Sequence, residues 1–156
     1  MPKVLFVCLG NICRSPLAEA IFDHQCQSKG LTGYSSDSAG TGAYHIGQQP
    51  DHRTIKVAND NHIPIDHRAR KFEPEDCDEF DFIFAMDQSN FEDIISISGY
   101  RPKHLHLLRE FDSNQKGSPA DVPDPYYGGI DGFTNIYKIM SEAIDNFLTS
   151  QQAQKG

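Results

Sequence analysis

The sequence has few basic residues for its length. Among its 156 residues, 14 are lysine or arginine and 22 are aspartate or glutamate, which gives a formal net charge of -8 at pH 7. Proteins that bind the nucleic-acid backbone do so with a basic surface, so this composition argues against nucleic acid as the main partner. A small phosphorylated substrate stays compatible with it, because one pocket can be positive on an acidic protein.

Long apolar runs are also absent. The stretch over residues 4–9 is too short and too poorly flanked for a signal peptide, and no run approaches the ~20 apolar residues of a membrane span. The cysteines are few and show no pattern of a secreted disulfide framework: Cys8, Cys13, Cys26 and Cys77. Such usage suits a reducing compartment. We therefore expect a cytoplasmic protein that does not insert into membranes.

No repeat, linker or low-complexity segment divides the chain, so we expect one domain over residues 1–156, and a monomer by default. Strand and helix signals alternate along it. Strands are predicted at 4–8, 34–39, 80–86 and 104–108, and helices from Pro16 to Gly30, from Asp51 to near Asn61, after Asp87 and over 133–149. This order predicts an α/β fold: one doubly wound domain with a four-stranded parallel sheet and helices on both faces.

The remaining segments are predicted to be irregular. Residues 67–72 read as an extended segment, and residues 112–132 read as a long loop because they are rich in proline, glycine, aspartate and serine. Residues 151–156 are predicted to form a frayed, flexible tail. Asp51 and Asp87 are expected to cap the helices that follow them.

The loop after the first strand carries the strongest chemical signal, Cys8-Leu9-Gly10-Asn11-Ile12-Cys13-Arg14-Ser15. A thiolate can attack phosphorus, a guanidinium can hold two phosphate oxygens, and a loop that enters a helix offers free N–H groups to an anion. Ser15 is predicted as the N-cap, with Pro16 at the first helical position. A lone cysteine in an apolar run is usually a core residue. The spacing to Arg14 instead favours a nucleophile beneath a bound phosphate.

The segment V-C-L-G-N-I-C-R-S-P resembles the signature of the low-molecular-weight protein tyrosine phosphatases, and the resemblance covers nearly the whole chain. It implies that Cys8 is the nucleophile and forms a phosphocysteine, and that Arg14 clamps the phosphate. Phosphate binding is then expected from the remaining loop residues, Leu9, Gly10, Asn11, Ile12, Cys13 and Ser15. The resemblance further implies that the Ser15 hydroxyl hydrogen-bonds to the sulfur.

The same resemblance implies a support behind the loop. Asn11 would brace it in a strained conformation that asparagine tolerates. Ser38 and His67 match the serine and histidine that support this brace in the family. The alternative for His67 is a solvated loop histidine near Arg68 and Arg70.

Asp124 is the candidate general acid. It lies in Val-Pro-Asp-Pro-Tyr-Tyr-Gly-Gly, where two prolines restrict the backbone around it. Taken alone it could equally be an acidic turn residue, but D-P-Y-Y matches the acid loop of the family. The resemblance then implies that Asp124 protonates the leaving phenol and later activates water. Tyr126, Tyr127 and Tyr44 are expected to wall the pocket, which favours phosphotyrosine over phosphoserine in a protein substrate.

Three other functions compete with this interpretation. An arsenate reductase of the same fold would need a pair of shuttle cysteines in mid-chain, where Cys77 stands alone. A phosphoarginine phosphatase of the family tends to carry threonine in place of Ile12. A module that binds phosphotyrosine without hydrolysing it is expected to lack the nucleophile, arginine or acid, and Cys8, Arg14 and Asp124 are all present.

No metal or organic cofactor is expected. The spacing of Cys8 and Cys13 is not that of a zinc site, and His104 and His106 on one side of a strand are more typical of a polar sheet face. Adjacency in one loop suggests instead that Cys8 and Cys13 form a reversible disulfide under oxidant. Mass spectrometry of peroxide-treated protein that finds no peptide linked through these two cysteines would contradict this hypothesis.

Overall fold

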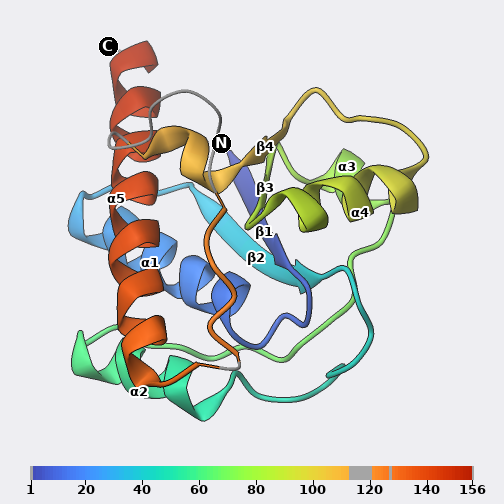
Figure 1. Ribbon diagram of the computed structural model, residues 1–156. Helices are drawn as coiled ribbons and strands as arrows, with labels where there is room; N and C mark the ends of the chain where they lie inside the picture. The colour runs from blue at the N-terminus through green and yellow to red at the C-terminus, as the bar shows by residue number, and fades with distance from the viewer. Residues whose placement is uncertain (1, 113–120, 127, 156) are drawn as a thin grey trace.

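The part of the chain that the structure describes contains one sheet of four parallel strands (Figure 1). The structure is a computed structural model, and it describes residues 2–112, 121–126 and 128–155. The strands lie in the order β2-β1-β3-β4, and all pairs are parallel: β1 (Lys3–Cys8), β2 (Ser35–Gly40), β3 (Phe82–Ala85) and β4 (Leu105–Leu107). The predicted four-stranded parallel sheet is thus confirmed.

Helices cover both faces of this sheet, because alternate residues of the central strand point to opposite sides. Val4 and Phe6 of β1 pack into one cluster with α1 (Arg14–Ser28), α2 (His52–Asp60) and α5 (Ile130–Lys155). Leu5 and Val7 pack into a second cluster with α3 (Asp76–Glu79) and α4 (Gln88–Ser98). Figure 1 shows the same division, with α1, α2 and α5 on one side and α3 and α4 on the other. The doubly wound arrangement is as predicted.

The register brings the carboxyl ends of three strands together. Cys8 of β1 pairs with Gly40 of β2, and Val7 pairs with Ala85 of β3. The loop after each of these strands therefore begins at the same edge of the sheet, where ligands of open α/β folds bind. Gly40 is required at this edge, since a Cβ atom there would lie 2.7 Å from the carbonyl oxygen of Leu9.

Local sequence signals predicted two helix starts correctly. Asp51 accepts the N–H of Arg53 at 2.8 Å, and Asp87 accepts the N–H of Asn90 at 2.7 Å, so both aspartates are N-caps. The predicted cap Ser15 is wrong: α1 begins at Arg14 after Cys13 and has no side-chain cap. The hydroxyl of Ser15 is instead used inside the loop.

Other boundaries also differ from the prediction. The extended segment over 67–72 contributes only a bridge between Gly40 and Lys71. The last helix, α5, includes residues 130–132 of the predicted loop and 151–155 of the predicted tail, so the helix is longer than predicted at both ends, while the flexibility of the tail stays a prediction. Residues 149–155 include neither glycine nor proline to stop the helix. The short α3 and the 3₁₀ turn η1 (Leu108–Phe111) were not predicted.

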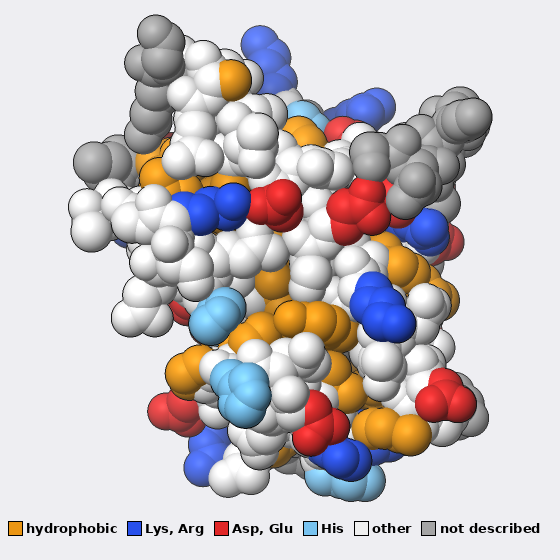
Figure 2. Space-filling view, turned by 90° about the vertical axis from the view of Figure 1, so that its left-hand side faces the viewer, with side chains coloured by type: hydrophobic (Ala, Val, Ile, Leu, Met, Phe, Trp, Pro, Cys, Tyr) orange, Lys and Arg blue, Asp and Glu red, His pale blue; other side chains and the backbone are white. Residues whose placement is uncertain are grey.

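Seen from the side of α5, the surface carries basic, acidic and histidine side chains scattered among uncharged ones (Figure 2). This face therefore presents no continuous basic stripe, in keeping with the acidic composition. Among the helices of the described residues, none combines the length and the apolar character that crossing a membrane requires.

Candidate active site

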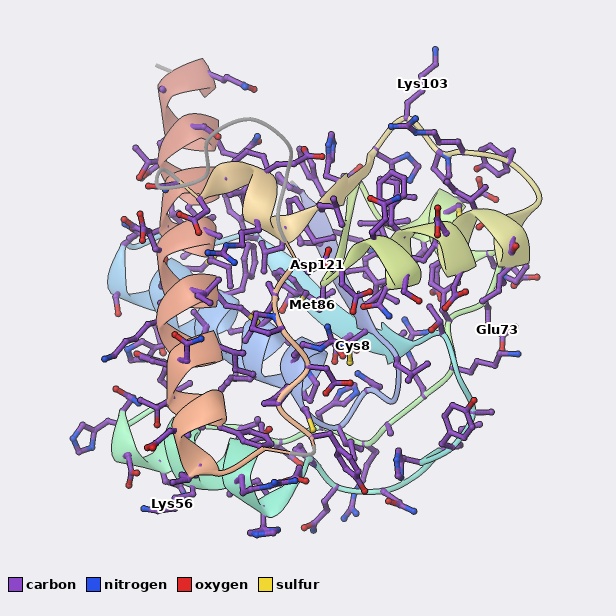
Figure 3. All side chains as sticks on the ribbon, viewed as in Figure 1. Cys8, Lys56, Glu73, Met86, Lys103 and Asp121 are labelled. Carbon is purple, nitrogen blue, oxygen red and sulfur yellow. The ribbon has the colours of Figure 1, made fainter. Side chains whose placement is uncertain are left out.

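The sulfur of Cys8 lies at the carboxyl end of β1, where the loop over residues 9–13 begins (Figure 3). Its Sγ is 3.0 Å from the hydroxyl oxygen of Ser15, and the backbone N–H of Asn11 donates to it at 3.3 Å. Hydrogen bonds to a sulfur stabilise its charged form. The predicted contact between Ser15 and Cys8 is therefore present, and it explains why Ser15 does not cap α1.

Asn11 holds the loop in its shape. Its φ is +57°, a left-handed conformation that costs energy for a residue with a side chain. Its amide nitrogen donates to Ser15 Oγ at 2.8 Å and Ser38 Oγ at 3.0 Å. Its amide oxygen lies 2.7 Å from His67 Nε2 and accepts the N–H of Arg70 at 2.9 Å. The structure thus brings Ser38 and His67 to Asn11, as the resemblance implied.

Glu19 belongs to this support, although the sequence analysis did not assign it a role. Ser38 donates its hydroxyl hydrogen to Glu19 Oε1 at 2.7 Å, and His67 Nδ1 lies 3.3 Å from the same oxygen. Burial raises the pKa of Glu19 to about 7, and burial also lowers the pKa of His67. The helical spacing between Ser15 and Glu19, four residues on one face of α1, is the sequence signal that could have identified it.

Glu19, Asp37 and His67 also bring three possible metal-ligand atoms within 4.8 Å of one another. All three residues already have other partners. Glu19 accepts from Ser38 at 2.7 Å, His67 faces Asn11 through Nε2, and Asp37 accepts from Nε of Arg70 at 3.0 Å. Because the Arg70 guanidinium supplies positive charge to the group, we interpret the cluster as the support of the loop.

Arg14 is buried, and its guanidinium is held from outside the loop. Nη1 donates to Asp87 Oδ2 at 2.8 Å and to the carbonyl of Val122 at 2.9 Å. Burial acts to lower the pKa of Arg14, but Cys8, Asp87 and Asp124 outweigh it, so the pKa is raised and the cation is retained. Asp87 was predicted as a cap and missed as a site residue. The neighbouring ends of β1 and β3 place it next to Arg14.

The acid loop, which is the segment over residues 121–126 that carries Asp124, reaches the site from a distant part of the sequence. Val122 donates its N–H to the carbonyl of Met86, and Asp121 Oδ1 accepts the N–H of Gln88, so this segment lies along the end of β3 (Figure 3). Asp124 follows, and its Oδ2 lies 3.8 Å from Nη2 of Arg14.

A cavity of about 450 Å³ collects these groups. It is lined by residues of the loop, of the acid segment and of the segment after β2: Cys8, Leu9, Gly10, Ile12, Cys13, Arg14, Tyr44, His45, Asp124 and Tyr126. Asn11, Ser15, Ser38 and His67 are not among them. Asn11 and Ser15, predicted to bind phosphate, thus act from behind the loop with their side chains.

The walls of the cavity are aromatic. Tyr44 is strongly exposed and Tyr126 partly so, and both line the opening. His45, which was not predicted, joins them, with its ring centroid 6.3 Å from that of Tyr126. Tyr127, the third predicted wall residue, lies outside the described residues. Cys13 also lines the cavity, and burial raises the pKa of its thiol, which disfavours the thiolate form of Cys13.

The geometry, a cysteine sulfur under a loop at the carboxyl end of a parallel strand, is the one expected of α/β proteins that bind an oxyanion over a cysteine. Similarity to known proteins identifies a family within this class. The sequence model described as "Low molecular weight phosphotyrosine protein phosphatase" matches residues 3–156. A curated relative of the same description from Schizosaccharomyces pombe is 47% identical over 152 residues, which cover 95% of this chain and 96% of the relative.

Solved structures agree with the sequence match. A crystal structure of protein tyrosine phosphatase from Entamoeba histolytica is 39% identical, covers 100% of both chains and has a TM-score of 0.91. A crystal structure of DARP, drosophila arginine phosphatase, is 32% identical, covers 97% of this chain and 98% of its own, and has a TM-score of 0.87. The chain therefore belongs to the low molecular weight phosphotyrosine protein phosphatase family.

Proposed function

We propose that this protein hydrolyses phosphotyrosine in protein substrates through a phosphocysteine at Cys8. The observation that carries the proposal is that Cys8, Arg14 and Asp124, from distant parts of the sequence, line one cavity. Family membership and the relatives named as tyrosine phosphatases support the same activity.

In the first step, the Cys8 thiolate attacks phosphorus, an S–P bond forms and the bond from phosphorus to the phenol oxygen breaks. Asp124, in its protonated form, gives its proton to the departing oxygen. The hydroxyl of Ser15 and the N–H of Asn11 stabilise the sulfur before attack. Arg14 holds oxygens of the phosphoryl group as charge spreads over them.

In the second step, water attacks the phosphorus of phosphocysteine and the S–P bond breaks. Asp124, now a carboxylate, takes a proton from this water and returns to its acid form. The electrons of the S–P bond return to Cys8 as a thiolate, which Ser15 and Asn11 again stabilise. Inorganic phosphate is the second product, and the described side chains supply every proton transfer.

The pocket supports phosphotyrosine as the substrate. Tyr44 and Tyr126 offer aromatic surface at the opening to stack on a phenol ring. Ile12 lines the cavity without a hydroxyl, which disfavours the phosphoarginine alternative, although one protein of similar structure is named an arginine phosphatase.

The decisive experiment measures phosphate release from 4-nitrophenyl phosphate with EDTA and a reductant. The wild type should hydrolyse the ester and Cys8→Ser should not. Cys77→Ser is the matched control, because Cys77 lies in α3 on the other face of the sheet, and it should keep full activity. Activity that survives Cys8→Ser, or a folded wild type without activity, would overturn the proposal. Peptides with phosphotyrosine, phosphoserine or phosphoarginine then identify the substrate.

We further propose one domain over residues 1–156 that acts as a monomer without metal or organic cofactor. The family model, which spans nearly the whole chain, supports the single domain. A nucleophilic thiol must stay reduced, which supports a cytoplasmic location. Light scattering tests the monomer, and full activity in EDTA is the expected result for the metal-free mechanism.

A further inference from the structure

Arg53, in the first turn of α2, joins three parts of the structure through one guanidinium group. Its Nε and Nη2 each lie 3.0 Å from a carboxylate oxygen of Asp51, the N-cap of the same helix. Nη1 donates to the carbonyl of Gly128 at 2.8 Å, and Nη2 donates to the carbonyl of Tyr126 at 2.9 Å. The guanidinium carbon also lies 4.5 Å from the ring centroid of Phe133 in α5. These contacts attach the acid loop to α2.

The start of α2 is attached in turn to the phosphate-binding loop, which is the loop from Cys8 to Ser15. The backbone N–H of Asp51 donates to the carbonyl of Ile12 at 2.8 Å. The buried hydroxyl of Thr54 donates to the carbonyl of Cys13 at 3.2 Å. The first turn of α2 therefore has a defined position relative to the loop, and the guanidinium transmits this position to the acid loop.

The carbonyl that Arg53 binds belongs to the residue that holds the general acid. The N–H of Tyr126 donates to Asp124 Oδ1 at 3.0 Å. The side chain of Asp124 is 44% exposed, so solvent leaves it free to move unless its backbone and this hydrogen bond hold it. A displacement of about 1 Å in a reacting group can cost about 10²-fold in rate. The orientation of Tyr126 therefore matters for catalysis.

We infer that Arg53 is a positioning residue that holds Asp124 over the phosphate-binding loop through the backbone of Tyr126. This inference rests on the proposed role of Asp124 as general acid. Arginine suits the task because its planar fork binds one carboxylate and two carbonyls at once. Lysine, a single point charge, cannot reproduce all of these contacts.

The test compares Arg53→Met and Arg53→Lys with Arg101→Met. Arg101 is a matched control, because its guanidinium lies 5.3 Å from the ring centroid of Phe91, on the opposite face of the sheet. The measured quantity is kcat/KM for aryl phosphates whose phenols range from 4-nitrophenol, which leaves easily, to tyrosine. This ratio reports the reaction up to cysteine phosphorylation, the step in which the acid protonates the leaving group.

Arg53→Met should lower kcat/KM by about tenfold or more for phosphotyrosine and by about twofold or less for 4-nitrophenyl phosphate, because a basic leaving group depends most on the acid. Arg53→Lys should give an intermediate loss, and Arg101→Met none. The inhibition constant of inorganic phosphate should stay unchanged, since phosphate needs the loop and not the acid. In an Asp124→Asn background, Arg53→Met should add little further loss.

An equal loss for all esters, no loss, a weaker binding of phosphate or full additivity with Asp124→Asn would each overturn the inference. If Asp124→Asn itself shows no dependence on the leaving group, the proposed acid is wrong and the inference fails with it. If the loss of kcat/KM depends on the leaving group in Asp124→Asn but not in the Arg53 variants, the inference about Arg53 is rejected while Asp124 is retained as the general acid. Should Arg53→Met unfold, Arg53→Lys decides by the same criteria.

Discussion

Asp87 uses its two carboxylate oxygens for two different elements of the site. Oδ1 accepts the N–H of Asn90 at 2.7 Å and caps α4, while Oδ2 accepts from Nη1 of Arg14 at 2.8 Å. The side chain of Arg14 is only 3% exposed, so water does not compensate its charge. The end of β3 therefore determines where the guanidinium of the phosphate-binding loop points.

The two roles of Asp87 can be separated with Asp87→Asn. Asparagine is also a good N-cap, so α4 should persist, but the negative charge opposite Arg14 is lost. We expect kcat/KM for 4-nitrophenyl phosphate to fall roughly 10- to 100-fold, in line with about 1.5–3 kcal/mol for a hydrogen bond to a charged group. The inhibition constant of inorganic phosphate should rise in parallel.

The control is Asp131→Asn, which alters an exposed acid in α5 and should change neither value. An unaltered phosphate affinity in Asp87→Asn would contradict the role of Asp87.

Asn11 combines backbone strain with side-chain hydrogen bonds, and two substitutions distinguish them. Asn11→Gly accepts the φ of +57° but loses the side-chain bonds, while Asn11→Ala also bears the left-handed penalty of about 1–2 kcal/mol. We expect both to lose activity, and the alanine variant to be the less stable one by about 1 kcal/mol in urea unfolding. Exposed His62, with φ of +59°, gives the matched pair His62→Ala and His62→Gly. If the alanine and glycine variants of Asn11 are equally stable while those of His62 differ, strain at Asn11 is not the cause.

Glu19 should make stability depend on pH. Its pKa in the folded protein is about 7, above the usual 4.5, because burial disfavours the carboxylate. Its stabilising contribution is then complete below about pH 4.5 and is lost as the pH rises through about 7. The free energy of unfolding of the wild type, minus that of Glu19→Gln, should fall by roughly 1–3 kcal/mol between pH 4.5 and 8. Urea titrations at several pH values measure this difference. The exposed Glu92→Gln is the control, and a flat difference for Glu19→Gln would refute the prediction.

Ile12 should influence the choice between phosphotyrosine and phosphoarginine. Its side chain lines the cavity and offers no hydroxyl to position water beside a guanidinium phosphate. We expect Ile12→Thr to raise the ratio of phosphoarginine to phosphotyrosine hydrolysis by about tenfold, the upper part of what one positioned hydroxyl contributes. Ile12→Val keeps the branched shape without the hydroxyl and should leave the ratio unchanged. Equal shifts in both variants would mean that volume, and not the hydroxyl, determines the preference.

Predictions that depend on neighbours in the sequence were the accurate ones. The apolar run ending at Cys8 is a buried central strand, and Asp51 and Asp87 cap helices through hydrogen bonds that span two or three residues. The Ser15 cap failed because its hydroxyl has partners brought by the fold, the sulfur of Cys8 and the amide of Asn11. The end of the last helix was predicted too early for a simpler reason: a polar end of a helix resembles a loop in composition.

The sequence alone determined the alternation of strands and helices and the contiguous loop from Cys8 to Ser15, because periodicity and adjacent residues encode both. Only the tertiary structure decided which distant groups meet this loop. The strand order β2-β1-β3-β4 brings Asp87 to Arg14, and packing of the segments after β2 and β4 brings His67 to Asn11 and Asp124 to the cavity. Burial then raised the pKa of Glu19, since the surrounding protein, and not the carboxyl group itself, sets the cost of ionising it.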